Sequence, residues 1–194
     1  LVLEFWTKGR AKSLIRIQEP KKEKGTATLK LGDEIQNYLP KIDRTVRIGA
    51  AMLGGNWMGS HFTNDDLVKG SFLSRSYDGV IIQRTKGSDA DLLTIELKPK
   101  PDAAVVYGKI VLEVESAKSK VLPRKQTFFD TRGAVVRAMV FSDTKAYGAR
   151  TIPTRIRVVP ADKPDEFTEV IYENVQFDQP IDDDFFSLAR LRKG

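Results

Sequence analysis

Hydrophobic and polar residues alternate with a period of two along most of the chain. The alternation is clearest in residues 13–17, 26–31 and 93–98, where Leu93, Ile95 and Leu97 fall on one face because successive strand side chains point to opposite sides. It recurs in residues 1–6, 34–39, 45–48, 79–84, 110–114, 126–129, 134–141, 154–159 and 167–177. Turn residues such as Gly32-Asp33 and Pro164-Asp165 separate these runs. The pattern predicts an antiparallel meander of about eleven strands, enough for a sheet to curl.

Two segments depart from the alternation and predict short helices. Residues 63–68 begin with Thr63 as an N-cap, followed by acidic residues in the first turn. Residues 182–191 begin with three aspartates and end with basic residues. Charges in this order interact favourably with the dipole of a helix, so they favour a helix here. No internal repeat or linker-like composition separates the strands, so we predict a single domain over residues 1–194. The fold class expected from these patterns is mainly β with short helices.

The composition argues against catalytic and metal chemistry. The 194 residues include no cysteine and one histidine, His61, which excludes thiolate metal sites and cysteine nucleophiles. Ser60 precedes His61, but no nucleophile elbow is present, and adjacent residues do not form a catalytic pair. The aspartates of residues 182–184 are explained by the helix start rather than by a calcium site. We therefore expect no enzyme activity, no metal and no cofactor.

The net charge of +6 does not indicate nucleic-acid binding. Basic residues mostly alternate with apolar ones, as in Arg155-Ile156-Arg157-Val158, which is typical of the solvent face of a strand, and no nucleic-acid recognition motif appears. Anionic lipid head groups or an acidic protein explain the charge equally well. The longest uncharged stretch, residues 48–64, contains glycines and polar residues, so we expect no membrane-spanning segment.

A glycine-rich, methionine-bearing segment between residues 52 and 67 is the most informative feature. Its apolar residues are Met52, Leu53, Trp57, Met58, Phe62 and Leu67. They are interpreted either as simple core packing or as a flexible lid over an apolar cavity, since methionine adapts to irregular partners and glycine permits movement. The sheet residues expected to line such a cavity are Ile95, Leu97, Ile110, Leu112, Val114 and Phe129. A one-residue slip in register would reverse the face in each strand.

Several longer motifs resemble the LolA-like superfamily of outer-membrane lipoprotein-sorting proteins. They are Gly25 to Asp33, Asn37-Tyr38-Leu39-Pro40, Trp57 to Leu67, Leu122-Pro123, Phe129-Asp130, Val140-Phe141-Ser142-Asp143, Tyr172-Glu173-Asn174-Val175 and Phe186-Ser187. The resemblance covers nearly the whole chain. The W-M-G-S-x-F-T-x-x-D-L segment is similar to one uncharacterised branch of the superfamily rather than to the lipoprotein carrier itself.

The resemblance implies an unclosed β-barrel of about eleven antiparallel strands with helices as a plug and lid. It also implies a periplasmic carrier that binds lipoprotein acyl chains or other lipids in an apolar cavity and transfers them to the outer membrane. Arg44 and Arg47 are candidates for an arginine that contacts the lid, and they are equally well explained as solvent-facing strand residues. The alternative function is an envelope regulatory or scaffold module that senses lipoproteins or docks onto a membrane protein.

The start of the chain bears on location. The first residue is Leu1 within a predicted strand, and the superfamily's first helix is missing, so we expect a processed or trimmed form of an exported protein. The absence of cysteine agrees with export to an oxidising compartment. Nothing in the sequence indicates the oligomeric state.

Overall fold

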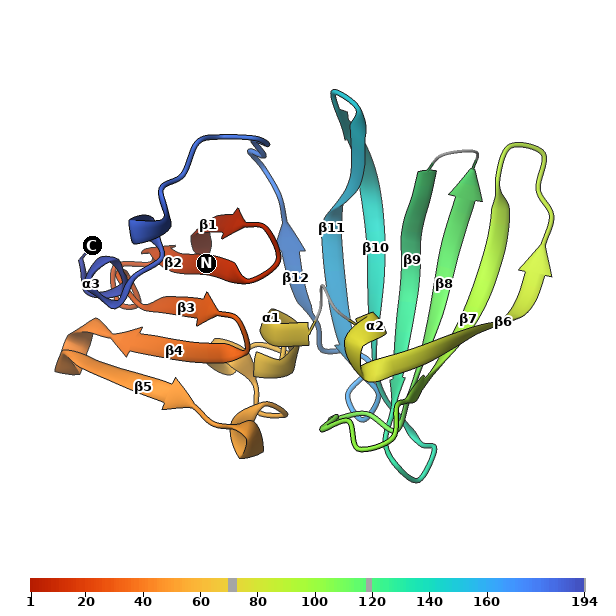
Figure 1. The fold of residues 1–194 in the computed structure, drawn as a ribbon, viewed down its shortest axis with the longest axis horizontal. Helices are drawn as coiled ribbons and strands as arrows, with labels where there is room; N and C mark the ends of the chain where they lie inside the picture. Colours follow the sequence, from red (N-terminus) through yellow and green to blue (C-terminus); the bar gives the residue numbers. More distant parts are fainter. Residues whose placement is uncertain (70–72, 118–119, 194) are drawn as a thin grey trace. The chain divides into compact units, whose positions relative to one another are not determined.

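The computed structural model describes residues 1–69, 73–117 and 120–193, which form two antiparallel sheets (Figure 1). The five-stranded sheet contains β1 (Val2–Lys8), β2 (Lys12–Glu19), β3 (Ala27–Leu31), β4 (Glu34–Leu39) and β5 (Arg44–Ile48). The seven-stranded sheet contains β6 (Tyr77–Thr85), β7 (Asp91–Pro99), β8 (Lys109–Ala117), β9 (Lys120–Phe129), β10 (Val135–Tyr147), β11 (Arg150–Pro160) and β12 (Thr168–Ile171). The helices are η1 (Pro40–Ile42), η2 (Ala50–Met52), η3 (Trp57–Gly59), α1 (Asn64–Lys69), α2 (Leu73–Ser76), η4 (Asp183–Phe185) and α3 (Leu188–Arg192).

The two sheets belong to two compact units. The first comprises the described parts of residues 1–56, 63–71 and 178–194, and the second those of residues 57–62 and 72–177. In both sheets each strand pairs with its neighbour in sequence, as predicted for a meander. The predicted fold class is confirmed: the described chain is mainly β with short helices, and its strands form no closed barrel. The strands divide between two sheets instead of forming one, and the single-domain prediction stays a prediction.

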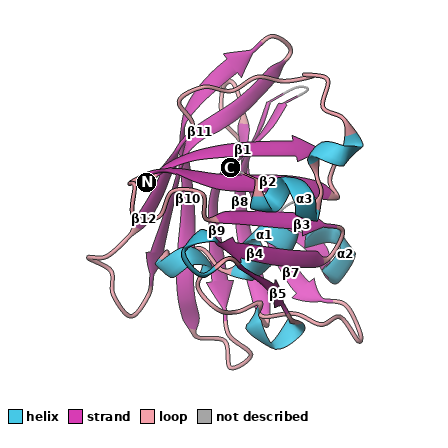
Figure 2. Cartoon of the chain, turned by 90° about the vertical axis from the view of Figure 1, so that its left-hand side faces the viewer, coloured by secondary structure: helices cyan, strands magenta, loops and turns pink. Residues whose placement is uncertain are grey.

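The first unit buries one face of its sheet beneath the C-terminal segment. Leu14 pairs with Leu29, and Tyr38 pairs with Ala27, which lies two residues before Leu29 on the same face of β3. Phe186 and Leu191 pack against them, together with the half-buried Trp6 and Phe185. Figure 2 shows β1 to β5 side by side with α3 at this sheet. Residues from the two ends of the sequence therefore form one hydrophobic core.

Polar contacts fix the C-terminal segment at both of its turns. The Arg16 guanidinium donates to the carbonyl oxygens of Arg190 (2.6 Å) and Leu191 (3.4 Å), which lie in the last turn of α3. These carbonyls have no partner within the helix, so a buried arginine can satisfy them. Burial lowers the pKa of Arg16. At the other turn, Lys8 and Lys12 contact the Asp183 carboxylate at 2.8 and 3.0 Å.

The helix predicted over residues 182–191 is interrupted. The structure has the 3₁₀ turn η4 and then α3, because Phe186 and Ser187 between them have extended or irregular backbone angles. The Ser187 side chain accepts a hydrogen bond from the Arg190 N–H and caps α3. By contrast, the helix predicted from residue 63 is confirmed as α1. The Asp66 N–H donates to the Thr63 hydroxyl (3.3 Å) and the Thr63 N–H to the Asp66 carboxylate (2.7 Å), which is a capping box.

In the second unit, β9 begins six residues before the predicted strand. Pro123 lies inside this strand, although proline cannot donate a hydrogen bond to a ladder. The register between β8 and β9 shifts between Glu113 and Val114, which pair with Lys125 and Pro123. This bulge leaves Arg124 as the extra residue and accommodates the proline within a long strand.

The cross-strand register places apolar residues of all the central strands on one face of the seven-stranded sheet. Leu97 pairs with Ile110, and Ile110 pairs with Phe128. Farther along the same face, Met139 pairs with Val158. Directly opposite residues point to the same side of a sheet, so these residues form one continuous apolar surface, here called the apolar face.

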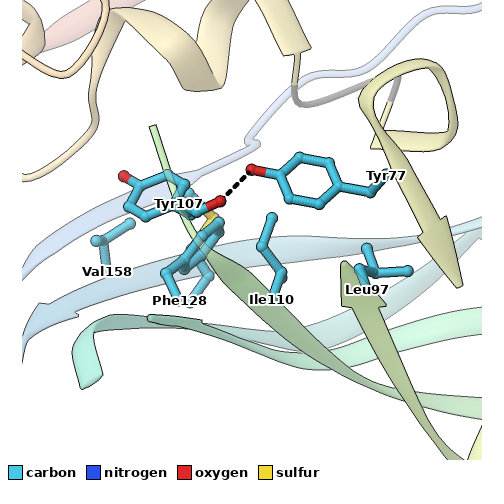
Figure 3. Packing of buried hydrophobic residues seen from close by; sticks show 7 residues of the cluster. Tyr77, Leu97, Tyr107, Ile110, Phe128 and Val158 are labelled. Carbon is cyan, nitrogen blue, oxygen red and sulfur yellow. Dashed lines mark hydrogen bonds between the residues drawn. The ribbon is translucent and has the colours of Figure 1, made fainter. Parts of the chain in front are cut away.

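Two tyrosines cover the centre of the apolar face. Tyr77 and Tyr107 belong to the same buried cluster as Leu97, Ile110, Phe128, Met139 and Val158 (Figure 3). The Tyr77 hydroxyl donates to the Tyr107 carbonyl oxygen at 3.0 Å, so its polar end is satisfied inside the core. The Tyr107 and Phe128 rings lie 4.7 Å apart. Phe128 is therefore central to this core.

The pairing of Asp183 with two lysines predicts an acid-sensitive contribution to stability. These contacts lower the pKa of Asp183 to about 2, below the value of about 3.9 in an unfolded chain. The stabilisation is therefore present above about pH 4 and is lost as the pH falls toward 2. We expect Asp183→Asn to lower the urea midpoint at neutral pH and to flatten its dependence on pH between about 4 and 2. Asp184→Asn makes the same charge change one residue away and serves as the control; equal effects of both would contradict the role of the lysine contacts.

The register predicts different roles for two adjacent phenylalanines. Phe128→Ala should lower the free energy of unfolding by about 3–5 kcal/mol, because it leaves a cavity in the core. Phe129 pairs with Lys109 and lies on the opposite face, where the Lys109 ammonium is 4.3 Å from its ring centre. Phe129→Ala should therefore cost clearly less. Chemical denaturation of both variants measures the difference, and a larger loss for Phe129→Ala would show that the register is wrong.

Candidate functional site

The apolar face extends beyond its buried centre and is the candidate site. Ile95, Leu112 and Phe141 lie on this face and are half-buried, packing against the central cluster. Ile81, which pairs with Ile95, is 57% exposed. A surface of this kind forms no directional contacts and can bind a ligand only by removing apolar area from water.

A buried arginine interrupts the apolar face. Arg137 pairs with Phe128 in the sheet and is 6% exposed. Its guanidinium carbon lies 4.3 Å from the centre of the Phe128 ring and 5.1 Å from that of Tyr107. Aromatic faces attract cations in this geometry, and the attraction offsets part of the cost of burying the charge. Sequence analysis missed Arg137, although it occupies the apolar frame of β10 with Met139 and Phe141.

Residues 57–62 form a tight loop held by its own hydrogen bonds. The Trp57 N–H donates to the Phe62 carbonyl at 2.7 Å, and the Ser60 N–H donates to the Trp57 carbonyl at 2.9 Å. Met58 and Gly59 have φ values of 49° and 72°, so the chain makes two left-handed steps in succession. Phe62 packs against the central cluster of the apolar face.

The same loop is attached to the seven-stranded sheet through His61. Its N–H donates to the Thr168 hydroxyl at 3.0 Å, and its ring Nδ1 lies 3.0 Å from the same oxygen. Arg137 donates to the His61 carbonyl at 3.2 Å, and the Glu166 carboxylate lies 3.6 Å from Nε2. These contacts join the loop to β10 and to the start of β12, so His61 has a positioning role in the structure.

The geometry gives Ser60 a local structural role. Its hydroxyl donates to the Trp57 carbonyl at 2.7 Å and accepts from the Phe62 N–H at 3.2 Å. The His61 ring contacts Thr168 and Glu166 instead. In the described ranges no group of three His, Cys, Asp or Glu residues is placed to hold a metal ion. A helix long and apolar enough to cross a membrane is likewise absent from those ranges.

The predicted lid residues divide between the two units. Trp57, Met58 and Phe62 belong to the second unit, whereas Met52 and Leu53 belong to the first. Leu53 packs against Ile35 and Ile48 beneath the five-stranded sheet. Met52 is 48% exposed, and its carbonyl accepts from the Asn64 amide at 3.0 Å.

Most of the predicted sheet residues share the apolar face. Leu97 and Ile110 belong to its buried cluster, and Ile95 and Leu112 pack against it. Val114 pairs with Pro123 farther along β8 and is buried. Phe129 lies on the opposite face, and Phe128 takes the inward position that the prediction gave to its neighbour.

Arg44 and Arg47 lie on β5, the edge strand of the five-stranded sheet. Both are exposed, and the Arg47 guanidinium lies 2.5 Å from the Glu34 carboxylate on β4. In the part of the chain that the structure describes, the exposure of both arginines and the Arg47–Glu34 ion pair agree with the interpretation as solvent-facing strand residues. A role in contacting a lid stays a proposal.

A family model described as "Uncharacterized protein" matches residues 9–193. No curated protein matches the sequence significantly.

Solved structures with similar folds come from three bacteria. A candidate outer membrane lipoprotein-sorting protein domain from Vibrio parahaemolyticus is 24% identical with a TM-score of 0.83, over 98% of this chain and 82% of that one. A LolA superfamily protein from Nitrosomonas europaea is 22% identical with a TM-score of 0.77, over 97% of this chain and 81% of that one. A DUF1329 family protein from Desulfovibrio piger is 22% identical with a TM-score of 0.84, over 93% and 76%.

These likenesses agree with the resemblance seen in the sequence motifs. The sequence identities are low, so the similarity to the solved structures concerns the fold. The chain therefore belongs to the uncharacterized protein family whose model covers residues 9–193, and it has the LolA-like fold.

Proposed function

We propose that this protein is a non-enzymatic carrier that shields the acyl chains of lipoproteins or other lipids, in the periplasm, on their way to the outer membrane. The observation that carries the proposal is the apolar face, which continues from its buried centre to half-buried residues such as Ile95 and Leu112. The names of two similar structures, a LolA superfamily protein and a lipoprotein-sorting domain, support the same class of cargo.

Burial of hydrocarbon supplies the driving force for this function. Each methylene removed from water contributes about 0.8 kcal/mol, so about ten methylenes contribute about 8 kcal/mol before the costs of association. No covalent chemistry is needed, and the cargo is released when a more apolar acceptor is available. This fits a carrier that must both bind lipid and give it up.

In the cargo surface proposed here, the half-buried Ile95 and Leu112 contact the acyl chain. The buried residues beneath and beside them are Leu97, Ile110, Val114 and Phe128. Phe62 packs against the centre of the apolar face, and Trp57 and Met58 belong to the same loop of the second unit. The part that Met52, Leu53, Arg44 and Arg47 play in covering cargo is a proposal that rests on the resemblance alone.

A pair of adjacent residues on β8 provides the test. Leu112 lies on the apolar face, whereas Val111 pairs with Glu96 and Thr127 on the opposite face, and both are half-buried. Leu112→Asn should weaken binding of a fluorescent acyl-chain probe by about tenfold or more, because it places an amide against hydrocarbon. Val111→Asn should leave binding near the wild-type value.

Native mass spectrometry after exposure to a bacterial lipid extract completes the test. Bound lipid on the wild type and on Val111→Asn, with loss on Leu112→Asn, is the expected result. Absence of lipid from the wild type would contradict the carrier. Retention of a protein partner by the delipidated wild type would instead favour the envelope scaffold.

A further inference from the structure

A β-bulge in β6 places Arg84 on the apolar face. Ile81 of β6 lies opposite Ile95 of β7, and Ile95 packs against the buried cluster of that face. The register shifts beyond Ile81, so that Arg84 lies opposite Leu93. Leu93 is two residues from Ile95 and therefore points to the same side of β7. Without the extra residue, alternation from Ile81 would send Arg84 to the opposite face, and bulges often re-aim a side chain in this way beside functional sites.

The Asp91 carboxylate fixes the direction of the Arg84 guanidinium. It accepts a hydrogen bond from Arg84 Nε at 2.7 Å and lies 2.5 Å from Nη2. The hydrogen bond from Arg84 and the nearby charge of Lys86 lower the pKa of Asp91, so the carboxylate stays ionised. Two positive charges then stand beside one negative charge. A guanidinium has five N–H donors, so these contacts leave donors for a second anion.

Arg84 and Arg137 lie on the same face but differ in how their charges are surrounded. Arg137 is 6% exposed, and its guanidinium lies against the rings of Phe128 and Tyr107. The Arg84 side chain is 63% exposed on the edge strand β6. Of the two, Arg84 is therefore the one that a ligand on the apolar face can reach.

Exposure falls from this edge of the sheet inward. Arg84, Leu93 and Val114 are paired across β6, β7 and β8, and they pass from exposed through half-buried to buried. Ile95 and Leu112, the next inward-facing residues along β7 and β8, are half-buried. This part of the face is thus charged at its open end and apolar farther in. A lipid with an anionic head and a hydrocarbon chain has the same polarity.

On the basis of the carrier function proposed above, we infer that Arg84 binds the anionic head group of the cargo while the acyl chain lies over Leu93, Ile95 and Leu112. The cargo class is an acyl lipid whose head carries phosphate. Arginine suits this role because its planar fork of donors matches phosphate oxygens. Asp91 acts as a positioning residue through Arg84. The apolar face selects for the chain, and Arg84 selects among head groups.

Two lipids that share one acyl chain test this inference. They are a monoacylglycerol and the same molecule with a phosphate on its glycerol, both used below the concentration at which they form micelles. Displacement of a fluorescent acyl-chain probe should show that the wild-type chain binds the phosphate lipid about tenfold more tightly. Arg84→Gln should lose this preference and still bind the neutral lipid within about twofold of the wild type, because it removes only a charge-assisted contact.

Lys98→Gln is the matched control, because it makes the same charge change on β7. Lys98 pairs with Asp78 on the opposite face, and its ammonium lies 3.1 Å from the Glu96 carboxylate. This variant should keep the preference for the phosphate lipid. Inorganic phosphate, added as a competitor, should not displace that lipid, because it has no chain to bury.

The outcomes separate the role of Arg84 from the carrier function itself. Equal affinity of the wild type for both lipids, or equal losses in Arg84→Gln and Lys98→Gln, would overturn the role of Arg84 and leave the carrier in place. Displacement by inorganic phosphate would also overturn it and assign Arg84 to a soluble anion. If the wild type bound neither lipid, the carrier function would be wrong, and this inference with it.

Discussion

The cross-strand register of the seven-stranded sheet is the constraint on which the candidate site depends. Antiparallel pairing places Leu97, Ile110 and Phe128 on one side, and a slip of one residue would send all of them to the other side. This face also positions Tyr77, Tyr107 and the loop of residues 57–62. Phe62 packs against its apolar centre, and His61 is hydrogen-bonded to Arg137 and Thr168. The face thus organises both the core and the segment beside it.

Period-two alternation was sufficient to predict most of the strands, but not every inward residue. Where apolar and polar residues strictly alternate, as at Leu93, Ile95 and Leu97, the face follows directly from the sequence. At Phe128-Phe129 two adjacent aromatic residues make both frames equally apolar, and only the pairing with Ile110 and Lys109 distinguishes them. At Arg16 the alternation predicts the wrong exposure. This arginine resembles a solvent-facing residue of an alternating strand, yet it is 4% exposed because its guanidinium satisfies the carbonyls of a helix about 170 residues away.

The predicted lid shows the limit of reasoning from a cluster in the sequence. Met52, Leu53, Trp57, Met58 and Phe62 are close along the chain and similar in composition, which favours a common role. In the structure, two contacts separate them: Asn64 holds the Met52 carbonyl in the first unit, while the Trp57 N–H closes on the Phe62 carbonyl in the second. The spacing of hydrophobic residues in the sequence carries no information about such short-range hydrogen bonds to an asparagine side chain or to the backbone.

Arg137 limits how the proposed carrier can use its apolar face. A buried charge is expensive to leave beside hydrocarbon unless its surroundings compensate for it. The Phe128 and Tyr107 rings and the His61 carbonyl provide such compensation, and they also occupy the area around the guanidinium. The half-buried residues Ile95 and Leu112 lie on the strands toward β6 and away from Arg137. The part of the face formed by β6, β7 and β8 is therefore the more favourable place for an acyl chain to bind. That part ends at β6, the edge strand of the sheet.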